Sequence, residues 1–221
     1  MNLDGLQSAL VDLDGTLVDT AGDFVAALCA VLDDLGLPPV DRSLVERLIG
    51  KGADHIVREA LAAAGAGESA GGLFERARIL YREHYMAVNG RHATVYPGVE
   101  EGLHALAGRG LRLACVTNKL AAFAEPLLRA KGLDRHFEQL CCGDRYGRLK
   151  PDPLPLLRTC ELMHASPERT LVIGDSSNDV RAARAARCPV VLVTYGYNHG
   201  EPAQAASADG YVDSLAQLGA G

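Results

Sequence analysis

The sequence predicts an α/β fold, in which helices cover a parallel sheet and a helical segment is inserted after the first strand. Short apolar runs alternate with longer segments of helical periodicity along most of the chain. The strongest apolar runs end directly at polar residues, which is typical of strands that lead into a site. Between residues 20 and 93 the periodicity is helical, with no convincing strand.

Five short apolar runs, each bounded by polar or turn residues, are predicted as strands. They are residues 9–13, 111–116, 137–142, 171–173 and 190–193, of which the third is the weakest. Ligands bind beside the carboxyl ends of such strands, where the strand order reverses. We therefore expect a Rossmann-like sheet of order 3-2-1-4-5, numbered along the chain, so that the polar strand ends share one crevice.

The helical insert is predicted as a cap domain of residues 20–94, and residues 1–19 and 95–221 as the α/β core. Phe24, Leu28 and Val31 follow helical spacing at the start of the insert, and Ile56, Ala60 and similar positions repeat it. The turn formed by Pro97 and Gly98 marks the return to the core.

Charge and composition narrow the class of protein. The 221 residues have an ordinary apolar content and a formal net charge of -6, which argues against a nucleic-acid binder. No apolar run is long enough to cross a membrane, and the N-terminus has no apolar signal core. The six cysteines form no C-x-x-C pair, which favours neither a zinc site nor a disulfide scaffold. We expect a cytoplasmic protein that is a monomer or a small homo-oligomer.

The first predicted strand ends in Asp12-Leu13-Asp14-Gly15-Thr16, which is the strongest functional signal. If the strand continues to Asp14, both carboxylates point into one cavity. Two carboxylates so close repel each other unless a cation or a shared proton compensates them, and Mg²⁺ prefers such oxygen ligands. The alternative is a simple turn at the strand end.

Three further motifs follow other predicted strands or loops. Asp175 and Asp179 lie in Gly-Asp-Ser-Ser-Asn-Asp after the fourth strand, Thr117 and Asn118 follow the second strand, and Lys150 precedes a proline. Together they offer carboxylates, hydrogen-bond donors and one positive charge. Each also has an ordinary structural explanation, as a helix cap or as a solvated lysine.

With all four motifs present in this order, the chain resembles the haloacid dehalogenase superfamily, and the insert is similar to that family's helical cap. The resemblance implies that Asp12 is the nucleophile and forms an aspartyl phosphate. It implies that Asp14 protonates the leaving alkoxide and later takes a proton from water. Thr117 and Lys150 would hold the phosphoryl oxygens, and Thr16 and Asn118 would help to bind the substrate.

The same resemblance implies one Mg²⁺. Its ligands would be Asp12, Asp175 and the backbone carbonyl of Asp14. Asp179 would support the metal shell or Lys150. Phosphoryl transfer depends mainly on positioning and on charge neutralisation, and these residue types supply both.

Residues 49–54, 117–119, 150–153, 174–179 and 194–198 are similar to the corresponding motifs of bacterial phosphoglycolate phosphatases. This implies a small phosphorylated metabolite as partner, with 2-phosphoglycolate as the expected substrate. Lys51 and Gly52, in the loop before a predicted helix, would contact the leaving group. Lys51 departs from the family pattern, which leaves sugar and amino-sugar phosphates open as substrates.

The same motifs exclude some other functions of this family and leave others open. Dehalogenases and phosphonate hydrolases of this family lack an acid at the position of Asp14, so this chain does not fit them. A mutase similar to β-phosphoglucomutase keeps both aspartates and stays open. So does a domain of the same fold that binds a phosphorylated metabolite without catalysis.

Overall fold

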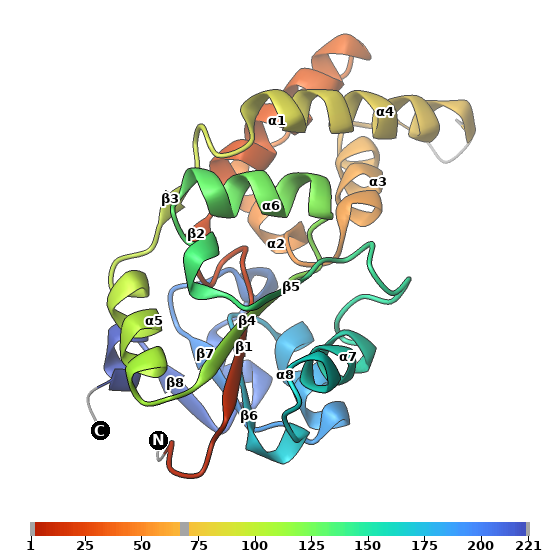
Figure 1. The fold of residues 1–221 in the computed structure, drawn as a ribbon. Helices are drawn as coiled ribbons and strands as arrows, with labels where there is room; N and C mark the ends of the chain where they lie inside the picture. Colours follow the sequence, from red (N-terminus) through yellow and green to blue (C-terminus); the bar gives the residue numbers. More distant parts are fainter. Residues whose placement is uncertain (1–2, 67–70, 220–221) are drawn as a thin grey trace.

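The computed structural model describes residues 3–66 and 71–219, and shows a parallel sheet with helices on both faces (Figure 1). Six strands form the sheet in the order β5-β4-β1-β6-β7-β8, and every neighbouring pair is parallel. The strands are β1 (Ser8–Val11), β4 (Arg112–Val116), β5 (Gln139–Cys141), β6 (Thr170–Gly174), β7 (Val190–Val193) and β8 (Gly210–Val212).

The predicted order of five strands is confirmed, since β5, β4, β1, β6 and β7 are the third, second, first, fourth and fifth predicted strands. The sequence did not predict the edge strand β8, whose three residues are only half-buried.

The predicted end of the first strand was wrong. β1 ends at Val11, and the backbone oxygen of Leu13 accepts hydrogen bonds from the N–H groups of residues 16, 17 and 18. A tight turn, rather than an extended strand, therefore sets the relation between Asp12 and Asp14.

Alternating residues of the strands point to opposite faces of the sheet and build two apolar layers. Ala9 and Val11 belong to a layer with helices α5 and α6, while Leu10 belongs to a layer with α7 and α8. These helices are α5 (Val99–Gly108), α6 (Ala121–Ala130), α7 (Leu154–Leu162) and α8 (Ser177–Ala186). Because both faces are covered, the carboxyl edge of the sheet is where side chains at the strand ends can meet.

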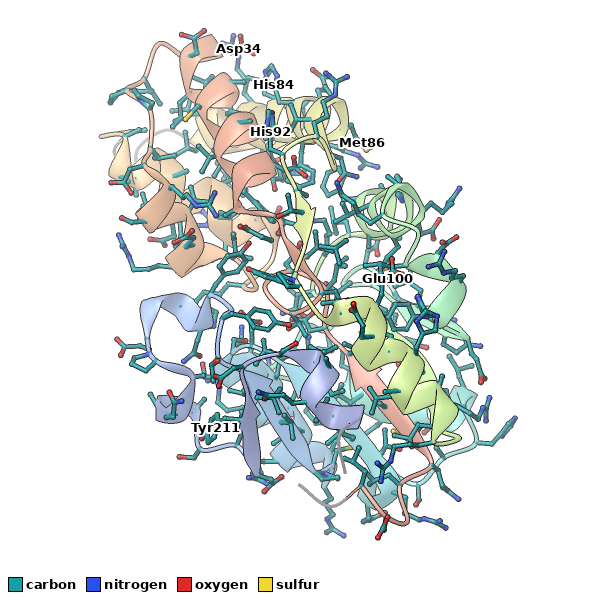
Figure 2. All side chains as sticks on the ribbon, turned by 90° about the vertical axis from the view of Figure 1, so that its left-hand side faces the viewer. Asp34, His84, Met86, His92, Glu100 and Tyr211 are labelled. Carbon is teal, nitrogen blue, oxygen red and sulfur yellow. The ribbon has the colours of Figure 1, made fainter. Side chains whose placement is uncertain are left out.

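Four helices lie beyond that carboxyl edge, and we call them the cap helices (Figure 1). They are α1 (Ala21–Asp34), α2 (Arg42–Leu48), α3 (Ala53–Ala63) and α4 (Gly71–Val88). They share an apolar core of their own, to which Phe123 of α6 also belongs. At the far end of α1, Asp34 Oδ2 lies 2.7 Å from His84 Nε2 of α4 (Figure 2).

The chain enters and leaves the cap helices through one antiparallel pair of short strands. These are β2 (Val18–Asp19) and β3 (Thr94–Val95). The carboxylate of Asp23, in the first turn of α1, accepts hydrogen bonds from the N–H groups of Gly90 (2.6 Å) and His92 (2.7 Å). Among the described helices, none has the length and apolarity needed to cross a membrane.

Candidate active site

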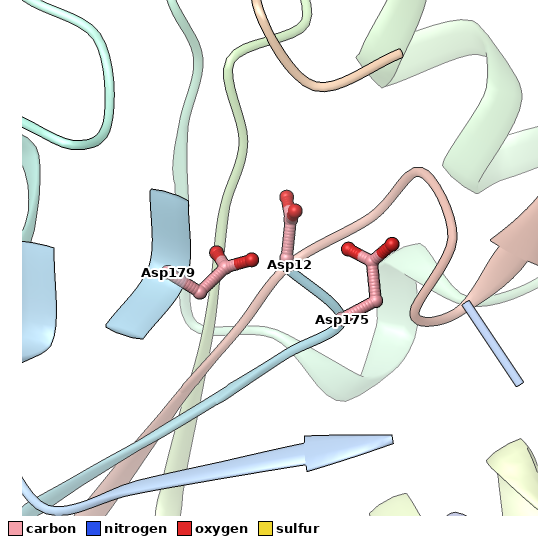
Figure 3. Close-up of side chains that lie close together, drawn as sticks. All are labelled: Asp12, Asp175 and Asp179. Carbon is pink, nitrogen blue, oxygen red and sulfur yellow. The ribbon is translucent and has the colours of Figure 1, made fainter. Parts of the chain in front are cut away.

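Three carboxylates converge at the carboxyl edge of the sheet (Figure 3). Asp12 follows β1, Asp175 follows β6, and Asp179 lies in the first turn of α8. One oxygen from each lies within 4.8 Å of the others, and all three side chains are buried. Because β1 and β6 are neighbours in the sheet, their ends bring together residues that are far apart in the sequence.

Lys150 joins two of these carboxylates. Its Nζ lies 2.9 Å from Asp12 Oδ1 and 2.7 Å from Asp179 Oδ1, and it also donates to the backbone oxygen of Val116 at 2.9 Å. The second oxygen of Asp179 accepts hydrogen bonds from the N–H and the hydroxyl of Ser176. Both oxygens of Asp179 are thus engaged, and the residue orients the ammonium group of Lys150.

The other two carboxylates each keep one oxygen unengaged. Asp12 Oδ1 also accepts from the N–H of Leu13, and Asp175 Oδ2 accepts from the N–H groups of Tyr197 and Asn198. Within residues 3–66 and 71–219, no hydrogen bond is made to Asp12 Oδ2 or to Asp175 Oδ1. These two atoms are free to meet a cation or a substrate.

Burial strongly affects the charges of this cluster. It raises the pKa of Asp12 to about 7, although Lys150 acts in the opposite direction, and it raises the pKa of Asp175 well above its usual value. Burial alone would lower the pKa of Lys150, but the charges of Asp12 and Asp179 outweigh it and raise that pKa. The protein therefore does not itself compensate all the negative charge.

A count of buried charges gives the same result. Four buried carboxylates (Asp12, Asp14, Asp175 and Asp179) face two buried ammonium groups, Lys119 and Lys150. With all six groups ionised, two negative charges stay uncompensated, which matches one divalent cation. The donors are all oxygens, the preference of hard cations such as Mg²⁺ and Ca²⁺. The residues present therefore fit a divalent metal.

Gly15 explains why the first motif needs a glycine after Asp14. Its φ is +85°, and a Cβ at this position would lie 2.4 Å from Asp175 Oδ2. Only glycine adopts this backbone conformation easily and leaves room for the carboxylate.

Asp14 lies apart from the three-carboxylate cluster, in a network that reaches the cap helices. Its Oδ1 accepts hydrogen bonds from the Thr20 hydroxyl at 2.7 Å and from Lys119 Nζ at 2.9 Å. Lys119 Nζ also donates to the hydroxyl of Tyr85, on α4, at 2.6 Å. The sequence alone indicated no individual site role for Lys119 or for Tyr85. Tyr85 is fully buried, and its hydroxyl belongs to this network.

One cavity lies between the carboxyl edge of the sheet and the cap helices. Five of the predicted site residues line it together, namely Asp12, Asp14, Gly52, Thr117 and Asn118. The other lining residues are Phe24, Gly50, Ala53, Tyr81, Lys119, Leu120 and Phe123. The cavity thus has Asp12, Asp14 and residues 117–119 on the sheet side, and mainly aromatic and aliphatic residues elsewhere.

Three predicted substrate contacts lie differently. Lys51 is exposed and lines a separate open depression beside Lys150 and Asn178. Thr16 is fully buried and does not line the cavity, and its hydroxyl has no hydrogen-bond partner in the described part of the chain. Asn118 lines the cavity, but its side chain donates to the backbone oxygens of Gly50 and Lys150 and accepts from the N–H of Lys150.

Tyr197 lies in the motif of residues 194–198, although the sequence alone indicated no individual role for it. Its N–H donates to Asp175, and its hydroxyl donates to Asp19 Oδ1 at 2.7 Å, where the chain passes into α1. The same hydroxyl accepts hydrogen bonds from the N–H groups of Thr20 and Ala21. Tyr197 therefore joins the acidic cluster to the start of the cap helices.

Comparisons of the sequence and of the fold with known proteins agree with one another. The family model described as haloacid dehalogenase-like hydrolase matches residues 9–193. The phosphoglycolate phosphatase of Cupriavidus necator is 46% identical over 96% of this chain and 90% of its own length, and that of Thiobacillus denitrificans is 41% identical over 96% and 93%. A crystal structure from Haemophilus somnus, described as a predicted phosphoglycolate phosphatase, superposes with a TM-score of 0.93 at 33% identity and covers 98% of both chains.

Proposed function

The chain belongs to the haloacid dehalogenase-like hydrolases, and on that premise we propose that it is a magnesium-dependent phosphatase that hydrolyses 2-phosphoglycolate to glycolate and phosphate. Relatives that share more than two-fifths of its residues over nearly its whole length support the class of a phosphoric monoester hydrolase. Within that class, the substrate, the metal and the roles of single residues are our proposals.

The arrangement of Asp12 supports the chemistry best. One of its oxygens is held by Lys150, while the other has no hydrogen bond from the described residues. Asp12 also lines the cavity. A carboxylate in this position can attack the phosphorus atom, and the bond from phosphorus to the ester oxygen breaks. The product on the protein is an aspartyl phosphate, which splits one difficult hydrolysis into two steps.

Asp14 would act as the proton donor in the first step and as the proton acceptor in the second. It passes a proton to the departing ester oxygen, which leaves as an alcohol. It then takes a proton from the water that attacks the aspartyl phosphate, so that phosphate leaves and Asp12 is restored. Proton transfer by a positioned carboxyl group contributes about 10²–10⁴-fold to a rate. Thr117 and Lys150 would hold the phosphoryl oxygens during both steps.

The metal would be held by the carboxylate of Asp12, by the free oxygen of Asp175 and by the backbone carbonyl of Asp14. The uncompensated charge of the cluster supports this assignment, and so do its oxygen-only donors. When bound, Mg²⁺ supplies positive charge that neutralises the phosphoryl oxygens as the bonds change. Asp179 would not bind the metal directly and would act by orienting Lys150.

Phosphate release from 2-phosphoglycolate, with and without excess chelator, tests this function directly. We expect turnover that is lost with chelator and restored by Mg²⁺, and a lower rate with glucose 1-phosphate, glucose 6-phosphate or muramic acid 6-phosphate. A higher kcat/KM for a sugar phosphate would refute the proposed substrate. Conversion of glucose 1-phosphate to glucose 6-phosphate without phosphate release would indicate a mutase, and activity in excess chelator would refute the metal.

A further inference from the structure

The cavity above Asp12 and Asp14 has a single cationic side chain among the described residues that line it, that of Lys119. We propose that Lys119 binds the carboxylate of the leaving group, and that it makes the enzyme selective for phosphate esters of small 2-hydroxy acids. The inference rests on the proposed function and assigns its substrate selectivity to one residue.

Lys119 is held in place by the protein before any substrate binds. Its side chain is only 2% exposed, and its Nζ contacts both oxygens of Asp14 and the Tyr85 hydroxyl. The same atom lies 4.5 Å from the centre of the Phe24 ring and 4.7 Å from that of Tyr85. Such contacts favour a cation and fix its position at the wall of the cavity.

The position of Asp14 determines which part of the substrate lies near Lys119. In the proposed reaction Asp14 meets the ester oxygen, because it gives that oxygen a proton. Lys119 Nζ lies 2.9 Å from Asp14 Oδ1, so it lies on the side of the leaving group. In glycolate one carbon separates the carboxylate from the ester oxygen, which is short enough for the same ammonium group to meet it.

The remaining walls favour a small anion over a sugar. Tyr81 has a hydroxyl, but the side chains of Phe24, Leu120 and Phe123 offer no hydrogen bonds to the hydroxyl groups of a sugar, and a polar group buried without a partner is costly. A carboxylate would be still more costly there without a cation, and Lys119 supplies that cation. Gly52 and Ala53 also line the cavity at the start of α3, where a helix N-terminus adds favourable N–H groups.

Lys51 provides a matched comparison within the same chain. It carries the same charge, but it is exposed and does not line this cavity. Removal of its charge should therefore leave selectivity for the leaving group unchanged, in contrast to removal of the charge of Lys119.

The test compares kcat/KM for 2-phosphoglycolate and for ethyl phosphate, whose leaving group has a similar length and no charge. The variants are Lys119→Met and Lys51→Met, in the full-length protein with Mg²⁺. We expect Lys119→Met to reduce the preference for phosphoglycolate by about 10–100-fold, as for the loss of a buried charged hydrogen bond. Effects that act through Asp14 lower both rates and cancel in the ratio. Lys51→Met should keep the ratio of the wild type.

Equal losses for both substrates in Lys119→Met would overturn the proposal, because Lys119 would then act only by positioning Asp14. Lys119→Arg keeps the charge and should keep most of the preference. If Lys119→Met does not fold, calorimetry can measure the binding of phosphoglycolate and of inorganic phosphate to two inactive variants, Asp12→Asn and Asp12→Asn/Lys119→Arg. Weaker binding of phosphoglycolate than of inorganic phosphate in both variants would contradict the proposal. A wild-type protein that cleaves ethyl phosphate but not phosphoglycolate would instead refute the proposed function itself.

Discussion

At the scale of single residues, the two oxygens of Asp12 have different surroundings. Oδ1 is held by Lys150 and by the N–H of Leu13, whereas Oδ2 has no hydrogen bond from the described residues. A nucleophile needs this combination, because one oxygen must be fixed in direction and the other must be free to form a bond. Lys150 in turn depends on Asp179, so the geometry of the reactive carboxylate is set from two positions.

Asp12→Asn should abolish turnover and leave the protein folded. An amide is a poor nucleophile and a weaker metal ligand than a carboxylate, and we expect kcat to fall by about 10³-fold or more. Phosphate release and circular dichroism would measure the two effects. The exposed Asp33→Asn variant is the matched control and should behave as the wild type. Wild-type turnover in Asp12→Asn, after mass spectrometry has excluded deamidation, would contradict the aspartyl-phosphate route.

At the scale of elements, one buried carboxylate joins the start of α1 to the loop that follows α4. Asp23 accepts hydrogen bonds from the N–H groups of Gly90 and His92, and its side chain is fully buried. The two helices also pack against each other along their length. The loop after α4 leads directly to β3, so this contact fixes where the chain returns from the cap helices to the sheet.

Asp23→Ala should lower the free energy of unfolding by about 3 kcal/mol. The substitution removes two hydrogen bonds to a charged acceptor and leaves two N–H groups without their partner. Urea unfolding followed by circular dichroism measures the change. Asp34→Ala, at the exposed far end of α1, should cost less than about 1 kcal/mol. A similar small cost for both variants would show that the Asp23 contact is not a stabilising one.

The strands show how far an element can be predicted from the sequence alone. Residues 190–193 were predicted correctly because a strand that is buried on both faces is a continuous apolar run. β8 was missed because Gly-Tyr-Val at a half-buried edge has no such run. The end of β1 was misplaced because Leu13 is apolar, although it lies in the turn.

At the scale of the whole molecule, the loop before α3 is fastened to the sheet side of the cavity. The backbone oxygen of Gly50 accepts hydrogen bonds from the side chains of Asn118 (2.8 Å) and Asn178 (3.2 Å). Asn118 holds the backbone of Lys150 at the same time. Two loops far apart in the sequence are therefore held together by one amide group.

Asn118→Ala should loosen this junction. We expect hydrogen exchange of residues 50–53 to become about tenfold faster or more, as for the loss of about 1.4 kcal/mol of local stability. Exchange followed by mass spectrometry would measure it, with the exposed Gln204→Ala variant as control. Unchanged exchange in Asn118→Ala would show that other contacts hold the loop.

Magnesium should stabilise the whole protein, because it would bind the folded cluster and not the unfolded chain. At a Mg²⁺ concentration of about 100 times the Kd, the free energy of unfolding rises by about 2.7 kcal/mol, which corresponds to roughly 5–10 °C in Tm for a chain of this size. Thermal unfolding with and without Mg²⁺ measures it. Asp175→Ala should lose the shift, while the exposed Glu101→Gln should keep it. The same shift in Asp175→Ala would contradict the metal assignment.

The site was predictable where a motif residue follows a strand, because the carboxyl ends of neighbouring strands must meet. Asp12 and Asp175 are examples, and the structure places them together. Lys119 was not predictable in this way. A lysine after Thr117 and Asn118 has the pattern of a solvated residue, and only the folded chain shows Asp14 and Tyr85 beside it. Tyr197 was missed because its contact with Asp175 is made by the backbone.

The antiparallel pair of β2 and β3 has a consequence for how such a protein can evolve. Val18 pairs with Val95 and Asp19 with Thr94, so everything between them departs from and returns to a single point of the fold. Insertions, deletions or a wholesale exchange of that segment need not strain the sheet. A lineage could thereby acquire new walls around the leaving group while it inherits Asp12, Asp175 and Lys150 unchanged.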